Sequence, residues 1–452
     1  MTSLDTIVIG AGYAGLVAAR ELKRAGLRAV VLEARDRVGG RTYSTELAGQ
    51  TIDLGGQWIG DQHHRLRALA DELGIVTFAQ HARGKKVLDR DGARRTFSGF
   101  LPRIPLLGLA DLGLSLLRLE RLATQVPLGA PLDARRAAAW DAQSLADWLD
   151  RHVHARAARE MLELAAQMIF AAEPRELSFL YFLLYVNSGK GLQRLAEIEH
   201  GAQERRFATG AQSVCTRLAA DLDVRLEHAA SAIEQDDRGV TVHTTRGTFR
   251  AARAILAVPP ALLARIDVRV SPVRAQLHRS MPAGSVIKCI AAYDRPFWRE
   301  AGYSGEAFSP KGLVRAVFDD CSADGSHAAL VAFVVGDPAR ELSTLTAEQR
   351  RPKILGELAR LHGPAAATPI AYVDKDWLTD EWATGCYVGV LGPGALTGIA
   401  SALRAPEGRL HFAGTETAVH HLGYIEGAIE SGERAAAEVI SHRESYLASA
   451  NA

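Results

Sequence analysis

The stretch DTIVIGAGYAGLVAARELKRAGLRAVVLE, residues 5–33, decides the fold at the start of this 452-residue chain. A β-branched run leads into the pattern GxGxxG at residues 10–15, a helical pattern follows, and a second apolar run ends at Glu33. Such glycines allow a tight turn, a close approach of the backbone to a pyrophosphate, and close packing of a helix on a strand. The stretch therefore predicts a β-α-β unit that binds a dinucleotide where its helix begins, because free N–H groups there stabilise phosphate charge. The predicted contact residues are Gly10, Gly12, Ala14, Gly15 and Glu33.

The residues that follow favour FAD over NAD as the dinucleotide. Glu33 can accept hydrogen bonds from both ribose hydroxyls. Beyond it, VLEARDRVGGRT (residues 31–42) and DLGGQWIG (residues 53–60) add two glycine-rich turns, and arginines that can neutralise a pyrophosphate. An NAD site does not need these additions, whereas an extended FAD whose flavin reaches a second domain does. The alternative interpretation of the first motif is a glycine-rich turn that only packs.

Length, composition and charge exclude several classes of protein. The chain is long enough for two cores, and its 48% hydrophobic and 23% charged residues are ordinary for a soluble protein. A net charge of +1 gives no reason to expect binding to nucleic acid. The four cysteines form no CxxC pair, so we expect no disulfide framework, no metal site and a reducing, cytoplasmic location. No apolar run reaches the roughly 18 residues of a transmembrane helix, so no membrane anchor is expected.

The motifs, taken together and in order, resemble those of the flavin-containing amine oxidases, and most closely those of the monoamine oxidases. The resemblance runs from about residue 6 to about residue 439. Besides the two glycine-rich turns, it rests on GAQERRF (201–207), GSVIKC (284–289), PFW (296–298), WLTDEWATGCY (377–387), FAGTET (412–417) and the pair Gly423-Tyr424.

The resemblance implies an α/β fold with two domains: a discontinuous Rossmann-like FAD domain, and an α+β substrate domain with a mixed sheet and helices. The FAD domain would comprise residues 1–77, 208–277 and 380–445. The substrate domain would comprise residues 78–207 and 278–379, followed by a tail at residues 446–452. Alternating residues and turn signals in residues 240–250 independently favour a strand pair there.

The resemblance also implies catalytic roles for Lys288, Tyr387 and Tyr424. Lys288 lies in an apolar, strand-like run, where a lysine is costly to bury unless it is paired or its pKa falls. The matching lysine of the family holds a water beside the reactive nitrogen of the flavin; the alternative is a lysine on the solvent side of an edge strand. The two tyrosines match the facing aromatic residues that flank the amine, and the alternative for each is an ordinary core tyrosine.

Cys386 matches the position at which monoamine oxidases bind FAD covalently through a thioether, so a covalent FAD is a hypothesis for this chain. Without the resemblance, a cysteine is most often a small buried hydrophobe. The further residues that the resemblance assigns to FAD are Ala34, Arg35, Gly40, Arg41, Gly56, Gln57, Trp58, Ala230, Trp377, Gly414, Glu416, Tyr424 and Ile425.

The resemblance also assigns a substrate cavity, lined by Ile169, Ala196, Gln203, Ala316 and Tyr387. The family has bulky gating residues where Ala196 and Ala316 align. Small residues there imply a wider or undivided cavity, which would suit a branched, cyclic or secondary amine.

The leading hypothesis is an FAD-dependent amine oxidase. Hydride would pass from the carbon next to the amine nitrogen to flavin, the imine would hydrolyse to an aldehyde or ketone plus ammonia or an amine, and O2 would be reduced to hydrogen peroxide. One alternative is a related flavin enzyme that acts on amino acids, polyamines, cyclic or secondary amines, or carotenoid or porphyrin precursors. Others are a dehydrogenase with a protein electron acceptor and a non-catalytic flavin-binding scaffold. A homodimer is an expectation of the resemblance alone.

Overall fold

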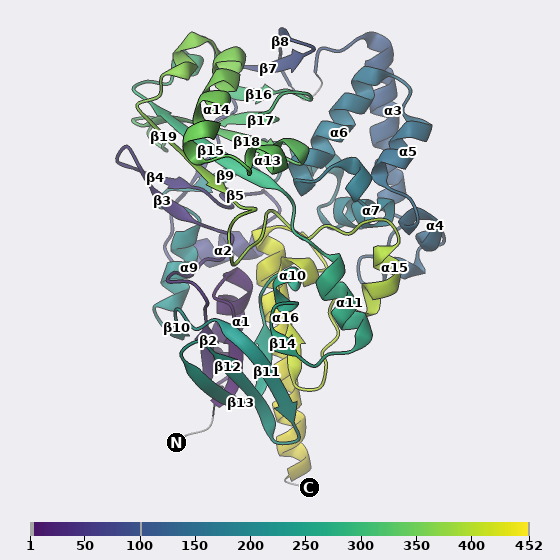
Figure 1. Cartoon of the computed structure of the whole chain (residues 1–452), viewed down its shortest axis with the longest axis vertical. Helices are drawn as coiled ribbons and strands as arrows, with labels where there is room; N and C mark the ends of the chain where they lie inside the picture. Colours follow the sequence, from purple (N-terminus) through teal and green to yellow (C-terminus); the bar gives the residue numbers. More distant parts are fainter. Residues whose placement is uncertain (1–3, 100–101, 451–452) are drawn as a thin grey trace.

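Two large sheets organise the chain in the computed structural model, which describes residues 4–99 and 102–450, with side chains described up to residue 443. The first sheet lies in the lower half of the view in Figure 1 and the second sheet in the upper half. Residues 1–3 of the predicted FAD domain and residues 451–452 of the predicted tail lie outside the described residues, and residues 446–450 belong to the last helix.

The first sheet mixes parallel and antiparallel strands in the order β10-β2-β1-β13-β12-β11-β14, with β20 paired to β13. Its strands are β1 (Leu4–Ile9), β2 (Ala29–Leu32), β10 (Asp223–Arg225), β11 (Ala230–Asp236), β12 (Gly239–Thr244), β13 (Gly247–Leu256), β14 (Asp267–Val268) and β20 (Leu410–Phe412). β1 pairs in parallel with β2 and β13, and its residues 6–9 are buried. A parallel strand that is covered on both faces reads as a continuous apolar run, as IVI does here.

Four helices pack on one face of the first sheet, and the first of them belongs to the dinucleotide unit: α1 (Tyr13–Arg24), α2 (His64–Glu72), α9 (Gln212–Ala219) and α16 (Ile425–Ala450). In Figure 1, α1 (purple) and α16 (yellow) run close together, and they pack against each other. A Cβ on Gly15 would lie 1.9 Å from the carbonyl oxygen of Gly10. Only a glycine therefore lets α1 begin this close to the end of β1.

The second sheet has the order β19-β15-β18-β17-β16-β7-β8 and is antiparallel except where β16 pairs with β7. Its strands are β7 (Lys85–Arg90), β8 (Ala93–Phe97), β15 (Val286–Tyr293), β16 (Tyr303–Phe308), β17 (Ala316–Asp319), β18 (Ala328–Val335) and β19 (Ala371–Asp376). Helix α14 (Ala347–His362) packs on one face of this sheet, where Ile287 and Cys289 point. Side chains alternate along a strand, so Lys288 points to the opposite face.

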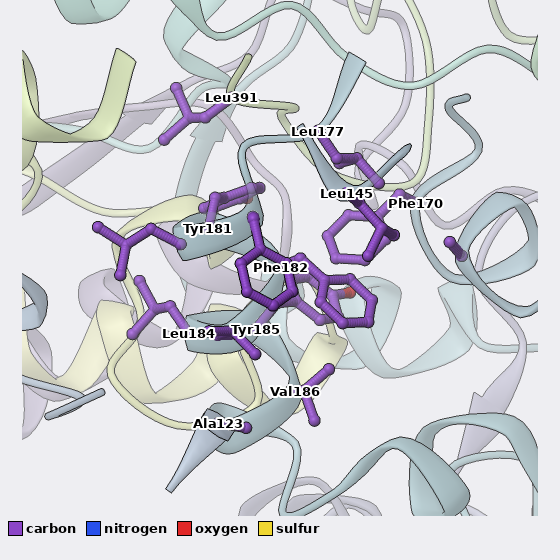
Figure 2. Close-up of a cluster of buried hydrophobic side chains, with 14 of the residues drawn as sticks. Ala123, Leu145, Phe170, Leu177, Tyr181, Phe182, Leu184, Tyr185, Val186 and Leu391 are labelled. Carbon is purple, nitrogen blue, oxygen red and sulfur yellow. The ribbon is translucent and has the colours of Figure 1, made fainter. Parts of the chain in front are cut away.

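A layer of helices lies beside the second sheet (Figure 1). Its members are α3 (Leu106–Ala123), α4 (Ala137–Asp141), α5 (Leu145–His152), α6 (Arg156–Phe170) and α7 (Phe179–Ser188). α7 is apolar on all sides, which is typical of a buried helix. Figure 2 shows its Tyr181, Phe182 and Tyr185 packed with Phe170 of α6. Each such buried apolar side chain contributes roughly 1.5–3 kcal/mol to folding.

Shorter elements connect these layers. They are β3 (Ser44–Leu47), β4 (Gln50–Asp53), β5 (Trp58–Ile59), β6 (Thr77–Ala79), β9 (Arg205–Phe207), α8 (Leu192–Ala196), α10 (Pro260–Leu263), α11 (Pro272–Ser280), α12 (Phe297–Glu300), α13 (Asp337–Leu342) and α15 (Ala395–Ile399). The predicted α/β class is confirmed, while the domain boundaries stay a prediction. Over the described residues, no helix combines the length and the apolar character that crossing a bilayer requires.

Candidate active site

Two cavities meet between the sheets. The nucleotide cavity, about 460 Å³, follows the ends of β1 and β2 and includes Gly12 and Glu33 in its lining. The apolar cavity, about 300 Å³, lies against the face of the second sheet that carries Lys288. Residues common to both linings are Gly56, Tyr387, Gly423, Tyr424 and Ile425. A ligand that fills the nucleotide cavity can therefore reach a ligand in the apolar cavity.

The nucleotide cavity fits the dinucleotide expected from the glycine motif. A Cβ on Gly12 would meet no heavy atom within 4 Å, so the backbone here is open to a ligand. The buried carboxylate of Glu33 accepts hydrogen bonds from the backbone N–H groups of Ala11 (2.6 Å) and Arg35 (3.0 Å). Burial raises its pKa, and the two N–H groups oppose that rise. They also hold the carboxylate at the cavity wall, where its remaining lone pairs can accept ribose hydroxyls.

Most residues assigned to FAD line the nucleotide cavity, namely Gly10, Gly12, Ala14, Glu33, Ala34, Arg35, Gly40, Arg41, Gly56, Ala230, Cys386, Gly414, Tyr424 and Ile425. Gln57 and Trp58 line the apolar cavity instead. In the part of the chain that the structure describes, Gly15, Trp377 and Glu416 line neither cavity. Gly15 allows close helix packing, Glu416 holds Arg41 of the nucleotide cavity, and Trp377 holds Leu54, the residue before Gly55 of the apolar cavity.

Glu416 acts through Arg41. The guanidinium of Arg41 donates two hydrogen bonds to this carboxylate, at 2.6 and 3.0 Å, and a third to the carbonyl of Tyr387 at 3.0 Å. Burial alone would lower the pKa of Arg41, but the pair with Glu416 raises it. Arg41 therefore stays charged at the cavity and ties the Tyr387 segment to the first glycine-rich turn. Trp377 has a similar supporting position, because its indole N–H donates to the carbonyl of Leu54 at 2.9 Å.

Lys288 brings a buried ammonium to the junction of the cavities. Only 3% of the residue is exposed, and its Nζ donates to the carbonyl of Gly55 at 2.9 Å and to Oε1 of Gln57. The rings of Trp58 and Phe333 lie 5.8 and 5.7 Å from Nζ. Burial lowers the pKa of Lys288 to about 8. Two of its three N–H groups have acceptors among the described residues, which leaves one for a water or a cofactor atom.

A buried network behind Lys288 was missed by the sequence reasoning. The amide of Gln57 donates to Asp320 at 3.0 Å, and Arg206 forms an ion pair with the same carboxylate. Burial raises the pKa of Asp320, while Arg206 and Lys288 oppose that rise. Arg206 belongs to the quoted motif GAQERRF, but no local pattern pairs it with a carboxylate 114 positions later.

Tyr387 and Tyr424 form the walls common to both cavities. Tyr387 packs edge-on to Phe333, with ring centroids 6.4 Å apart, and Tyr424 packs against Tyr185 at 6.2 Å. Burial raises the pKa of both tyrosines, so both stay neutral phenols. A Cβ on Gly423, whose φ is 86°, would lie 2.2 Å from the hydroxyl oxygen of Tyr185. Glycine is therefore required beside Tyr424 for the packing of this wall.

Cys386 lies on the cofactor side of the junction. It is buried and lines the nucleotide cavity, and its peptide bond to Tyr387 is cis. Burial raises the pKa of its thiol to about 12, although the nearby Arg41 guanidinium acts in the opposite direction. The thiol is therefore neutral at physiological pH.

The apolar cavity includes four of the five residues assigned to the substrate: Ile169, Ala196, Gln203 and Tyr387. Ala316 is fully buried and is absent from that lining. It pairs across the sheet with Phe308 on one side and Phe333 on the other, and a methyl group between two phenylalanines is too short to reach the cavity.

The sequence reasoning missed both the aromatic wall and the polar end of this cavity. Phe308, Phe318 and Phe333 line it from the second sheet, and Lys86, Glu197 and Glu306 line it farther from Lys288. Alternation along residues 303–308 and 316–319 is the signal that could have placed the phenylalanines on one face. The three charged residues belong to separate segments, and no motif connects them.

Comparisons with known proteins agree with this site. The family model described as flavin containing amine oxidoreductase matches residues 13–440. The chain is 37% identical over 445 residues to a probable flavin-containing monoamine oxidase A of Dictyostelium discoideum, which covers 97% of this chain and 98% of that protein. It is 36% identical over 449 residues to flavin-containing amine oxidase B of Homo sapiens, which covers 96% of this chain and 86% of that protein.

Two solved structures have the same fold over nearly the whole chain. Cyclohexylamine oxidase from Brevibacterium oxydans IH-35A matches with a TM-score of 0.93 and 32% identity, covering 98% of this chain and 100% of that chain. Wild-type putrescine oxidase bound to putrescine matches with a TM-score of 0.94 and 32% identity, and the match covers 97% of this chain and 99% of that chain. The chain therefore belongs to the family of flavin-containing amine oxidoreductases, enzymes that oxidise amines with FAD.

Proposed function

We propose that this enzyme oxidises small amines whose reacting end lies at the junction of the two cavities, beside Lys288, Tyr387 and Tyr424. The observation that carries the proposal is the common lining of the nucleotide cavity and the apolar cavity, with a buried lysine at their junction. The two tyrosines flank the amine as apolar walls. Because they stay neutral and their surroundings are buried, they favour a neutral amine over an ammonium.

When bound along the nucleotide cavity, FAD would supply the redox chemistry, the acceptance of a hydride from the carbon next to the amine nitrogen and the transfer of two electrons to O2, which with two protons becomes hydrogen peroxide. The chain positions the amine and keeps bulk water away from the reacting carbon. The imine product is hydrolysed to an aldehyde or ketone, with release of ammonia or an amine. Lys288 orients a water at the junction through its remaining N–H group, while Gly55 and Gln57 hold its side chain in place.

Cys386 is the proposed point of covalent attachment, through a thioether between its Sγ and FAD; forming it would break the S–H bond and a C–H bond of FAD, and the two electrons would pass through the flavin to O2. Its place in the lining of the nucleotide cavity, next to Tyr387, supports this role. Arg41, and to a smaller extent Arg35, are cations near this thiol that oppose the effect of burial on the thiol pKa. The attachment would retain the cofactor without changing the residues that contact the amine.

The proposal extends to the domain organisation. The strands of the first sheet fall within residues 1–77, 208–277 and 380–445, and those of the second sheet within residues 78–207 and 278–379. This distribution supports a discontinuous FAD domain and a separate substrate domain. We also propose a cytoplasmic location, with which the four buried, unpaired cysteines agree, and a homodimer, which rests on the family resemblance alone.

Anaerobic mixing of the flavin-loaded enzyme with a panel of amines tests the proposal. The panel contains an alkylamine, an arylalkylamine, cyclohexylamine and putrescine, and flavin absorbance is followed over time. We expect at least one amine to bleach the oxidised flavin spectrum, and O2 to restore it with formation of peroxide. If no amine reduces the flavin, the proposal is wrong. If reduction occurs but O2 does not restore the spectrum, the enzyme is a dehydrogenase with another acceptor.

A further inference from the structure

We propose that the polar end of the substrate cavity is a subsite for a hydrogen-bond-donating group, an ammonium or a hydroxyl, at the end of the substrate opposite the amine that is oxidised. The polar end is defined by Lys86, Glu197, Gln203 and Glu306, all of which line this cavity. The inference rests on the proposed function, because it assigns the second half of the same substrate.

An ion-pair cluster holds the polar end together. Nζ of Lys86 lies 3.0 Å from Oε1 of Glu306 and 3.7 Å from Oε2 of Glu197. Lys86 comes from β7 and Glu306 from the adjacent β16, whereas Glu197 directly follows α8. The lysine therefore fixes the position of both carboxylates relative to the cavity.

Two acceptor atoms at this end lack a partner. Glu306 is only 2% exposed, and its Oε2 forms no hydrogen bond among the residues that the structure describes, although the side chain of Ser304 on the same strand acts to lower the pKa of this carboxyl. Within the same described part of the chain, Oε1 of Gln203 is also buried and unpaired, while its amide donates to the carbonyl of Leu195 at 3.1 Å. A buried acceptor without a donor costs roughly 1–3 kcal/mol. When Glu306 is ionised, both orphan atoms are acceptors, so the group that satisfies them must be a donor.

Charge favours the same class of ligand. Two carboxylates and one ammonium leave a net negative charge at the polar end when all three are ionised. Burial raises the pKa of Glu306 and of Glu197, while Lys86 opposes both rises. With both carboxylates ionised, the single ammonium of Lys86 compensates one of the two negative charges, and a donor from the substrate would stabilise the ionised forms.

The register of the second sheet sets the spacing between the two ends. Lys288 pairs with Phe333, Phe333 with Ala316, and Ala316 with Phe308. These three steps across the sheet span about 14 Å at the usual strand spacing. Glu306 lies two positions before Phe308 on the same strand and, like it, lines the cavity. The intervening wall is aromatic, so the substrate that fits has an apolar middle and a polar group at each end.

A matched series of linear amines tests the subsite. For each of several chain lengths, the flavin-loaded enzyme is given the alkylamine, the amino alcohol and the diamine, and kcat/KM is measured for each. We expect a donor-terminated substrate to exceed its alkylamine by roughly tenfold or more, with an optimum chain length. A higher kcat/KM for the diamine identifies an ammonium as the bound group. A higher kcat/KM for the amino alcohol identifies a hydroxyl, and either result supports the subsite.

The variant Glu306→Gln separates this subsite from the catalytic residues. It should lower kcat/KM for the donor-terminated substrates by roughly tenfold to a hundredfold, without lowering it for the alkylamines, whose apolar tails form no hydrogen bond with the carboxylate. The matched control is Glu300→Gln, which alters an exposed glutamate outside the cavity. Activity toward alkylamines also reports that each variant has folded.

Two results would overturn the inference: no preference of the parent enzyme for a terminal donor, or a Glu306→Gln variant that affects all three substrate classes alike. If alkylamines reduce the flavin while a donor makes no difference, only the subsite is wrong. If no amine in the series reduces the flavin, the proposed function itself fails.

Discussion

A buried charged group stands at each end of the substrate cavity, the ammonium of Lys288 at one end and the carboxylate of Glu306 at the other, and the chain supplies them with different numbers of partners. At the junction with the nucleotide cavity, the ammonium of Lys288 has acceptors on Gly55 and Gln57 and a carboxylate, Asp320, behind it. At the polar end, Glu306 has Lys86 on one oxygen and no partner from the described residues on the other. The first end is preorganised by the chain itself, whereas the second end is completed by a ligand. A side chain whose partners all come from the chain is held in place for catalysis. A side chain that lacks a partner can instead discriminate between substrates that do and do not supply one.

The largest effect should come from removing the charge at the reacting end. Lys288→Met should lower the rate of flavin reduction or of reoxidation by O2 by roughly 100-fold or more for every amine, because water at the junction loses its orienting donor. Stopped-flow absorbance of the flavin, first without and then with O2, measures the two rates. Lys353→Met, at an exposed position of α14, is the control. Equal rates in the parent enzyme and Lys288→Met would remove the lysine from the mechanism.

A smaller change in rate should follow when Lys288 is kept and Asp320, the carboxylate behind it, is replaced. The pKa of Lys288 is about 8, lowered by burial and raised in part by Asp320. As the pH rises through this value, the lysine loses its proton. The rate of flavin reduction or of reoxidation should therefore change with pH around this value, and this part of the pH profile is called the limb. In Asp320→Asn the negative charge is gone, so the limb should move to lower pH.

The same variant leaves the buried Arg206 without its carboxylate, and the free energy of unfolding should fall by about 3–5 kcal/mol. Thermal melting measures that loss. The rate of flavin reduction or reoxidation, measured over a series of pH values, gives the position of the limb. Asp294→Asn, exposed just after β15, should change neither quantity. A limb that stays in place in Asp320→Asn would show that Lys288 is not the titrating group.

The smallest effect on turnover should come from the cofactor side of the junction. In Cys386→Ala the thioether cannot form, so acid precipitation should release the flavin into the supernatant, whereas the parent enzyme should keep it in the pellet. Turnover with saturating FAD should stay within about threefold, because FAD and not the thiol carries the redox chemistry. Yellow colour in the supernatant from the parent enzyme would contradict covalent attachment.

The parts of the site that are local in sequence could be predicted. Gly10, Gly12 and Glu33 lie within one β-α-β unit, where spacing along the chain determines spacing in the molecule, and all three line the nucleotide cavity. Lys288 was also found, because a lysine inside an apolar strand is unusual enough to draw attention. Of the polar end of the cavity only Gln203 was found, because Lys86, Glu197 and Glu306 each look like an ordinary surface charge in the sequence.

The sequence by itself determined the α/β class, the dinucleotide unit, the amine oxidase family and the residues at the junction of the cavities. Each of these features can be read from the spacing of nearby residues or from the order of motifs along the chain. Only the tertiary structure decided that Phe308 and not Ala316 lines the cavity, that Glu416 acts through Arg41, and that Glu306 presents a free acceptor. These outcomes depend on strand register and on contacts between segments far apart in the chain. A one-residue shift of register would have turned the same side chains to the other face of the sheet.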